Sequence, residues 1–134
     1  MSWNDYIATL MGTDKTVTED AAILCFTENS EAVWASHSNF KDITAAEVKR
    51  LVSTDRSTLF TDGLTLGGQK CRVILDNLHK EDEAMNLMTK DGNAITVSKA
   101  KTALVLLKGC KSIHGRQLLP QTMNMAKYLK DNGF

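Results

Sequence analysis

The sequence predicts an α+β fold: a central antiparallel β-meander sheet, the N- and C-terminal helices packed together on one face, and a further helix on the other. Three observations support this class. Short β-type runs follow one another between residues 57 and 108, separated by Asp-Gly and Gly-Gly turns, and such short connections join antiparallel strands. Helical periodicity occurs at both ends of the chain. A length of 134 residues is typical of one domain, so we expect a single domain over residues 1–134.

The N-terminal helix is predicted to begin almost at once, because Ser2 and Asp5 have the spacing of a capping box. The apolar residues after Ser2 fall on one broad stripe at 100° per residue; they are Trp3, Tyr6, Ile7, Leu10 and Met11. Two β-type runs follow at residues 21–26 and 32–36, joined by the polar turn TENSE. This stripe predicts a helix that packs one face against the rest of the domain.

Thr44 and Glu47 repeat the capping-box spacing and open a second amphipathic helix. The C-terminal helix is expected over roughly 117–131, with Pro120 in its first turn and Gly133 at its end. The strands of the meander are predicted from β-type composition and intervening turns, at residues 57–61, 64–66, 70–75, 84–89, 94–99 and 103–108.

Composition excludes several classes of protein. Sixteen basic side chains balance sixteen acidic ones, so we expect no nucleic-acid partner. No apolar run approaches the ~20 residues that span a bilayer, and the first residues do not resemble a signal peptide. Three widely spaced cysteines favour reduced thiols in the cytoplasm over a disulfide framework. We therefore expect a cytoplasmic protein, and a monomer.

The sequence offers no constellation for catalysis. The three histidines are scattered, and none has a second ligand at metal-binding spacing. No serine or cysteine lies in a nucleophile motif, and the carboxylates of HKEDE (79–83) are those of a solvated turn. We therefore expect no enzyme activity, no metal and no cofactor, and binding becomes the leading class of function.

The aromatic residues gather near the chain ends. Of eight in total, two lie in the first helix and two in the last few residues, which the predicted fold places together. For any single ring, core packing or capping of a terminal helix is the alternative interpretation. Four rings at adjoining ends favour an exposed aromatic groove, and such grooves suit polyproline II ligands.

Six segments carry a resemblance to a known family: SWNDYI (2–7), ITAAEV (43–48), DRSTLF (55–60), DGLTLGGQKCRVI (62–74), IHG (113–115) and MAKYLKDNGF (125–134). Together, and in this order, they resemble profilin of the vertebrate type over essentially the whole chain. The resemblance implies a central antiparallel sheet flanked by helices, with both terminal helices on one face. It also implies a non-enzymatic cytoplasmic, cytoskeleton-associated protein that binds monomeric actin, proline-rich segments of actin regulators and phosphoinositides.

The proline-rich site of the family corresponds here to Trp3, Tyr6, Trp34, Tyr128 and Phe134. Tyr128 stands where many relatives have His, and it keeps an aromatic face with a polar tip. Phe134 stands where many have Tyr, which removes a hydroxyl worth about 0.5–1.5 kcal/mol if it bonds a ligand carbonyl. The resemblance therefore implies that this site is kept.

The actin-binding positions of the family correspond to Phe60, Lys70, Val73, Leu75, Lys90, His114, Leu119 and Asn124. Leu75 and Met88 stand where vertebrate profilins usually carry Arg, Leu119 with Pro120 replaces an Asn-Lys pair, and Asn124 replaces a Glu. Neutral side chains do not reproduce the donors of Arg. Two readings stay open: an actin-monomer binder that regulates polymerisation, or an adaptor for proline-rich ligands with weakened actin and phosphoinositide binding.

The phosphoinositide patch implied by the family would consist of Arg72, Lys90, Lys108, Lys111 and Arg116. At zero net charge we expect only weak attraction to membranes. A third reading, a small enzyme or sensory module on a similar layout, follows from the fact that fold alone does not determine function.

Overall fold

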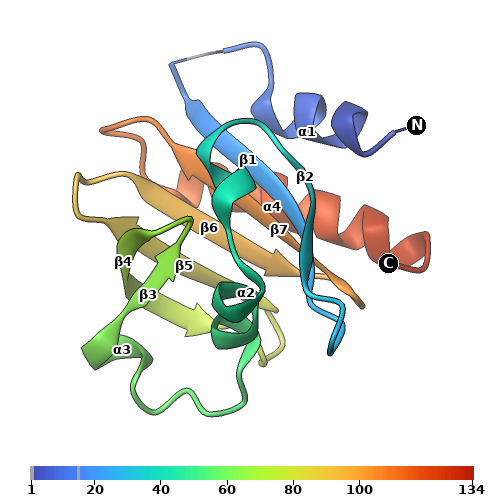
Figure 1. The fold of residues 1–134 in the computed structure, drawn as a ribbon. Helices are drawn as coiled ribbons and strands as arrows, with labels where there is room; N and C mark the ends of the chain where they lie inside the picture. Colours follow the sequence, from blue (N-terminus) through green and yellow to red (C-terminus); the bar gives the residue numbers. More distant parts are fainter. Residues whose placement is uncertain (1, 15) are drawn as a thin grey trace.

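The structure, a computed structural model, describes residues 2–14 and 16–134. Figure 1 shows a curved sheet with helices on both faces and the two chain ends close together. The elements in chain order are α1 (Trp3–Met11), β1 (Thr18–Cys25), β2 (Ala32–Ser36), the 3₁₀ turn η1 (Asn39–Asp42), α2 (Ala45–Val52), α3 (Leu59–Asp62), β3 (Leu64–Leu66), β4 (Gln69–Asn77), β5 (Ala84–Thr89), β6 (Ala94–Lys99), β7 (Ala103–Gly109) and α4 (Gly115–Asp131).

Seven antiparallel strands form one sheet in the order β2-β1-β7-β6-β5-β4-β3. Strands β3 to β7 form the predicted meander, and β1 joins it by pairing with β7. Every residue of β7 is buried, as expected for a central strand covered on both faces. The predicted α+β class and the antiparallel sheet are confirmed.

The two faces of the sheet bury separate hydrophobic clusters. Because side chains alternate along a strand, Leu104 and Leu106 of β7 point into the cluster beneath α2, whereas Val105 and Leu107 point into the cluster beneath α1 and α4. Figure 1 shows α1 and α4 lying alongside each other on one face and α2 on the other, as predicted.

The capping boxes predicted for the N-terminal helix and for the middle helix are both present. The Ser2 hydroxyl accepts a hydrogen bond from the Asp5 amide at 3.3 Å, and the Asp5 carboxylate accepts one from the Ser2 amide at 3.0 Å. Thr44 and Glu47 do the same at α2. Glu47 also accepts from the amides of Gly67 and Gly68, at 2.9 and 3.1 Å. A residue predicted only as a helix cap therefore also ties α2 to the β3–β4 turn.

Two predictions about local structure are wrong. Residues 57–61 do not form a strand, because Leu59–Asp62 is the short helix α3, which ends at Gly63 with φ of 70°. The C-terminal helix begins at Gly115 rather than near 117, since His114 acts as its N-cap. The His114 ring accepts from the Arg116 amide at 3.2 Å, so the helix gains two further residues.

This earlier start changes the position of Pro120, which lies inside α4 and not in its first turn. Two smaller differences concern the N-terminal half. β1 begins at Thr18 rather than residue 21, and η1 was not predicted. The buried Asp20 carboxylate accepts hydrogen bonds from the amides of Ser38 and Phe40, both at 3.0 Å, which holds η1 against β1.

Candidate functional site

Five aromatic side chains form one cluster at the end of the sheet where the chain termini meet. We call Trp3, Tyr6, Trp34, Tyr128 and Phe134 the aromatic cluster. The Trp3 ring is central: its centroid lies 4.8 Å from Trp34, 5.0 Å from Phe134 and 5.4 Å from Tyr6. Trp34 and Phe134 are 5.9 Å apart, and Tyr6 and Tyr128 are 5.7 Å apart. All five residues predicted for the proline-rich site are therefore brought together.

Different structural features position the individual rings. Trp3 begins the capped helix α1, and Tyr6 follows one turn later on the same side. Trp34 projects from the edge strand β2. Phe134 folds back after α4: its amide donates to Leu129 at 2.8 Å, and its carbonyl oxygen accepts from the Thr102 hydroxyl at 2.8 Å and from the Thr102 amide. The end of the chain is thus fastened to the β6–β7 turn.

The cluster is partly packed and partly open. Tyr128 and Phe134 are 45% and 37% exposed, whereas Trp3, Tyr6 and Trp34 are half-buried and pack against the cluster beneath α1 and α4. A side-chain hydrogen bond between Tyr6 and Tyr128 raises the pKa of the Tyr6 hydroxyl. Both interpretations of the aromatics hold in part, because the same rings cover the core and present apolar surface with polar tips.

The predicted actin-binding residues are spread over α3, β4, the β5–β6 turn and α4. Phe60 is 59% exposed and lines a pocket of about 440 Å³ with Lys70, Arg72, Met88 and Lys90, among others. A register shift between Val73 and Leu75 leaves both Ile74 and Leu75 about half exposed. Val73 itself is 6% exposed and belongs to the core, so it offers little surface.

The α4 members of that set lie along one helix. His114 is the exposed N-cap, Leu119 is half-buried and Asn124 is exposed. The exposed side chain of Ile74 was missed by sequence reasoning, because strict alternation of in and out does not anticipate a register shift. Met123, 40% exposed, was missed as well.

The basic residues predicted for phosphoinositides do not form one patch. Arg72 and Lys90 lie together in the pocket that also holds Lys70. Lys108 is 7% exposed, and its ammonium lies 2.9 Å from Glu19 and 3.2 Å from the Gln69 amide oxygen. Lys111 lines a different, polar pocket that contains several carboxylates, and Arg116 lies on α4.

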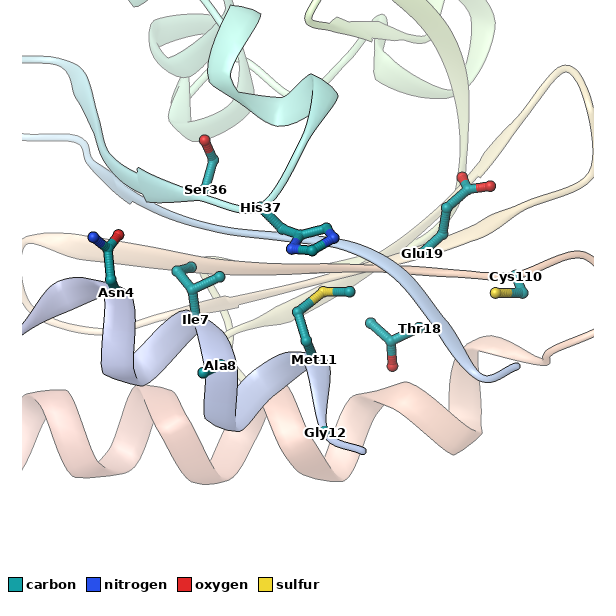
Figure 2. A pocket seen from close by; sticks show the side chains of 10 residues that line it. All are labelled: Asn4, Ile7, Ala8, Met11, Gly12, Thr18, Glu19, Ser36, His37 and Cys110. Atoms are coloured by element: carbon teal, nitrogen blue, oxygen red, sulfur yellow. The ribbon is translucent and has the colours of Figure 1, made fainter. Parts of the chain in front are cut away.

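Two pockets flank α1, and neither was predicted as such. The larger, of about 710 Å³, lies between α1 and strands β1 and β2; Figure 2 shows Met11, His37 and Glu19 around it. It contains no residue of the aromatic cluster. The smaller, of about 310 Å³, is lined by Tyr6, Thr9, Asn124, Met125 and Tyr128. The spacing of three residues from Tyr6 to Thr9 and from Tyr128 to Met125 was the available sequence signal.

The structure provides little for catalysis or metal binding. Within residues 2–14 and 16–134, no group of three or more His, Cys, Asp or Glu side chains could hold a metal ion. Burial raises the pKa of the Cys71 thiol to about 11, so this cysteine stays protonated and a poor nucleophile. In the same part of the chain, no helix has both the length and the apolar character to cross a membrane.

Comparison with known proteins agrees with this architecture. The family model for profilin matches residues 1–134. Human Profilin-1 is 44% identical over 136 residues, covering 96% of this chain and 95% of that protein. The structure of mouse Profilin IIa in complex with a double repeat from the FH1 domain of mDia1 superposes with a TM-score of 0.91 at 35% identity, covering 100% of both chains. Rat profilin 2a gives a TM-score of 0.90 at 37% identity, covering 98% of this chain and 96% of that one. The sequence match over the whole length, together with the shared fold, shows that this chain belongs to the profilin family.

Proposed function

We propose that this protein binds actin monomers, regulates their polymerisation and docks proline-rich segments of actin regulators on the aromatic cluster. It then acts as an adaptor without covalent chemistry, in the cytoplasm and in association with the cytoskeleton. The observation that carries the proposal is the assembly of five rings from α1, β2, α4 and the chain end into one partly exposed cluster. The FH1 repeats bound by the mouse relative are ligands of the proline-rich class.

The geometry of the cluster suits a polyproline II helix. Such a helix has no internal hydrogen bonds and exposes flat pyrrolidine faces and backbone carbonyls. Most of the ring pairs meet edge to face, and the rings of Tyr128 and Phe134 remain partly exposed. Tyr128 adds a hydroxyl close to that of Tyr6. Because the ligand is already rigid, little entropy is lost when it binds.

Actin binding is supported by family membership and by the exposed surface around Phe60 and Leu75. A second candidate is an adaptor with weakened actin affinity. It is favoured by the neutral side chains of Leu75, Met88 and Asn124, which offer no charge to a partner. A pyrene-actin assembly assay separates the two: slowed filament growth at excess protein indicates actin binding, and undiminished growth indicates the second candidate.

Phosphoinositide binding is expected to be weak. Lys70, Arg72 and Lys90 line one pocket, whereas Lys108 and Lys111 line another that also holds the carboxylates of Glu19, Asp20, Asp42 and Asp91. The Lys108 ammonium forms an ion pair with Glu19. Three cations attract an anionic surface by about 1 kcal/mol each, and the net charge of zero adds no long-range attraction. Co-sedimentation with vesicles should show binding only at low salt.

The proline-rich site is tested by tryptophan fluorescence. Trp3 and Trp34 both belong to the cluster, so a polyproline peptide should change the emission of the folded protein. Tyr128→Ala should weaken binding about tenfold, since it removes one partly exposed ring. Phe60→Ala, which removes an exposed ring from another surface, is the matched control and should bind normally. An unchanged spectrum at saturating peptide would contradict the assignment.

A further inference from the structure

The interface between α4 and the strands β5 and β6 is partly polar. Alternate residues of β6 point to opposite faces of the sheet: Ile95 and Val97 belong to the cluster beneath α2, whereas Thr96 and Ser98 face α4 and are 0% and 2% exposed. Asn86, the register partner of Thr96 in β5, points to the same face. Buried hydroxyl and amide groups need hydrogen-bond partners, because leaving them unpaired costs free energy.

One pair of polar side chains in this interface has its partners, and the other does not. The Ser98 hydroxyl donates to the Thr122 hydroxyl of α4 at 2.9 Å, and Thr122 donates to the Leu119 carbonyl oxygen at 3.0 Å. The Oδ1 atom of Asn86 and the Oγ1 atom of Thr96 are both buried, and neither has a hydrogen-bond partner among the residues that the structure describes. Because the two residues are directly opposed, these two oxygen atoms belong to one place in the interface.

The start of α4 covers this second pair. A Cβ atom on Gly115, the first residue of the helix, would lie 3.7 Å from the Asn86 carboxamide carbon and 3.8 Å from the Thr96 methyl carbon. The helix therefore begins directly over the two side chains, where its first amides have no intrahelical acceptor. Opposed side chains of an antiparallel pair have Cβ atoms about 4.5–5.5 Å apart. One water molecule bridges polar groups across such a separation.

We propose that Asn86 and Thr96 bind one water molecule beneath the first turn of α4. The water donates to Asn86 Oδ1, which is an acceptor only, and shares a second hydrogen bond with the Thr96 hydroxyl, which both donates and accepts. Both groups are neutral, which suits water and not an ion. A buried water typically makes about three hydrogen bonds to groups that are otherwise unpaired. The inference goes beyond the proposed function, because it concerns how the helix that begins after His114 is seated on the sheet.

A high-resolution crystal structure of the full chain is the direct test. We expect an ordered water oxygen within hydrogen-bond distance of both Asn86 Oδ1 and Thr96 Oγ1. Two results would overturn the inference: well-defined electron density with no water at this position, or hydrogen bonds from both side chains directly to the protein.

The variant Thr96→Val tests the same site in solution, because it keeps the shape of the side chain and removes the hydroxyl. If the hydroxyl is bonded to the water, the unfolding equilibrium constant should rise about fivefold or more, since a buried hydrogen bond is lost. If the hydroxyl has no partner, the same variant should lower that constant, because an unpaired polar atom is removed from the interior. The direction of the change in urea denaturation therefore separates the two cases.

A double-mutant cycle tests whether the two side chains share one water. Asn86→Leu combined with Thr96→Val removes both polar atoms and with them the need for the water, so the loss should be clearly smaller than the product of the two single effects. Ser98→Ala is the matched control, because Ser98 lies on the same strand and face but bonds to Thr122. Combined with Asn86→Leu, it should give the product of the single effects. A stabilising Thr96→Val, or single effects of Asn86→Leu and Thr96→Val that simply multiply, would contradict a shared water.

Discussion

Arg56 joins two parts of the structure that are distant in sequence. Its guanidinium donates two hydrogen bonds of 2.8 Å to the Asp76 carboxylate in β4. It also donates to the carbonyl oxygens of Leu51 and Ser53 at the end of α2, at 2.7 and 3.0 Å. Both ion-pair side chains are largely buried, so loss of either leaves the other without a partner. One side chain thus caps α2 and orders the segment that leads to α3.

We predict that Arg56→Met lowers the free energy of unfolding by about 2 kcal/mol at pH 7, measured by urea denaturation. The hydrogen bonds from Arg56 hold the pKa of Asp76 below its usual range. The unfolded chain therefore binds the proton more tightly, and the stabilisation is present above the ordinary pKa and is lost as pH falls through the lowered one. The difference between Arg56→Met and the unmodified protein should therefore shrink as the pH falls below the ordinary pKa of an aspartate. Lys49→Met, at an exposed lysine of α2, should change stability by less than about 0.5 kcal/mol.

At the scale of the element, α4 contains a residue that is unfavourable inside a helix. Helix α4 runs for 17 residues with Pro120 inside it. Proline cannot donate to the carbonyl four residues earlier, which here belongs to Arg116, and its ring crowds the preceding turn. The helix persists because one face is held by the core: Leu118, Met125, Ala126 and Leu129 are buried beneath it. Tertiary packing therefore outweighs the local cost of Pro120.

Pro120→Ala should raise the free energy of unfolding by about 1–3 kcal/mol, because it restores the missing donor and a better helix former. Thermal unfolding followed by circular dichroism measures the change. Gln121→Ala, at an exposed position of the same helix, is the control and should have a small effect. A decrease for Pro120→Ala would mean that contacts of the exposed proline ring stabilise the fold by more than its backbone cost.

At the scale of the whole molecule, the candidate ligand surfaces occupy different elements. The aromatic cluster is built from α1, β2 and the C-terminal end of α4, whereas the surface around Phe60 and Leu75 lies on α3 and β4. These surfaces share no residue, which permits two macromolecules to bind at once. Asn124, a predicted actin-binding residue on α4, also lines the pocket of about 310 Å³ beside Tyr6 and Tyr128.

We therefore predict independent loss of the two activities. Phe60→Ala should weaken the effect on pyrene-actin assembly about tenfold, because exposed aromatic side chains often contribute strongly to an interface, while proline-rich binding stays unchanged. Tyr128→Ala should show the reverse pattern. Phe60 is 59% exposed, so its removal should not destabilise the fold. Equal losses of both activities in either variant would contradict two separate surfaces.

Local signals in the sequence predicted much of this structure. The capping boxes of α1 and α2 and the turns of the meander depend on residues close together in the chain, and each is confirmed. The positions at which sequence reasoning failed have different causes. Residues 57–61 have β-type composition, yet they form α3 between the Arg56 contacts and the start of β3. The position of Pro120 depended on His114 acting as a cap.

The candidate site divides in the same way. The sequence showed which aromatic residues lie near the chain ends, because aromatic residues in a terminal helix can be identified without tertiary information. The family resemblance implied that Trp34 joins them, and the tertiary structure brings it there through pairing of β1 with both β2 and β7. It also buried Lys108 beside Glu19 and formed the pocket of about 310 Å³ between α1 and α4, two helices more than 100 residues apart. Exposure and contact between such distant segments depend on which strands pair and on how the helices pack against the sheet. No local sequence pattern predicts that arrangement.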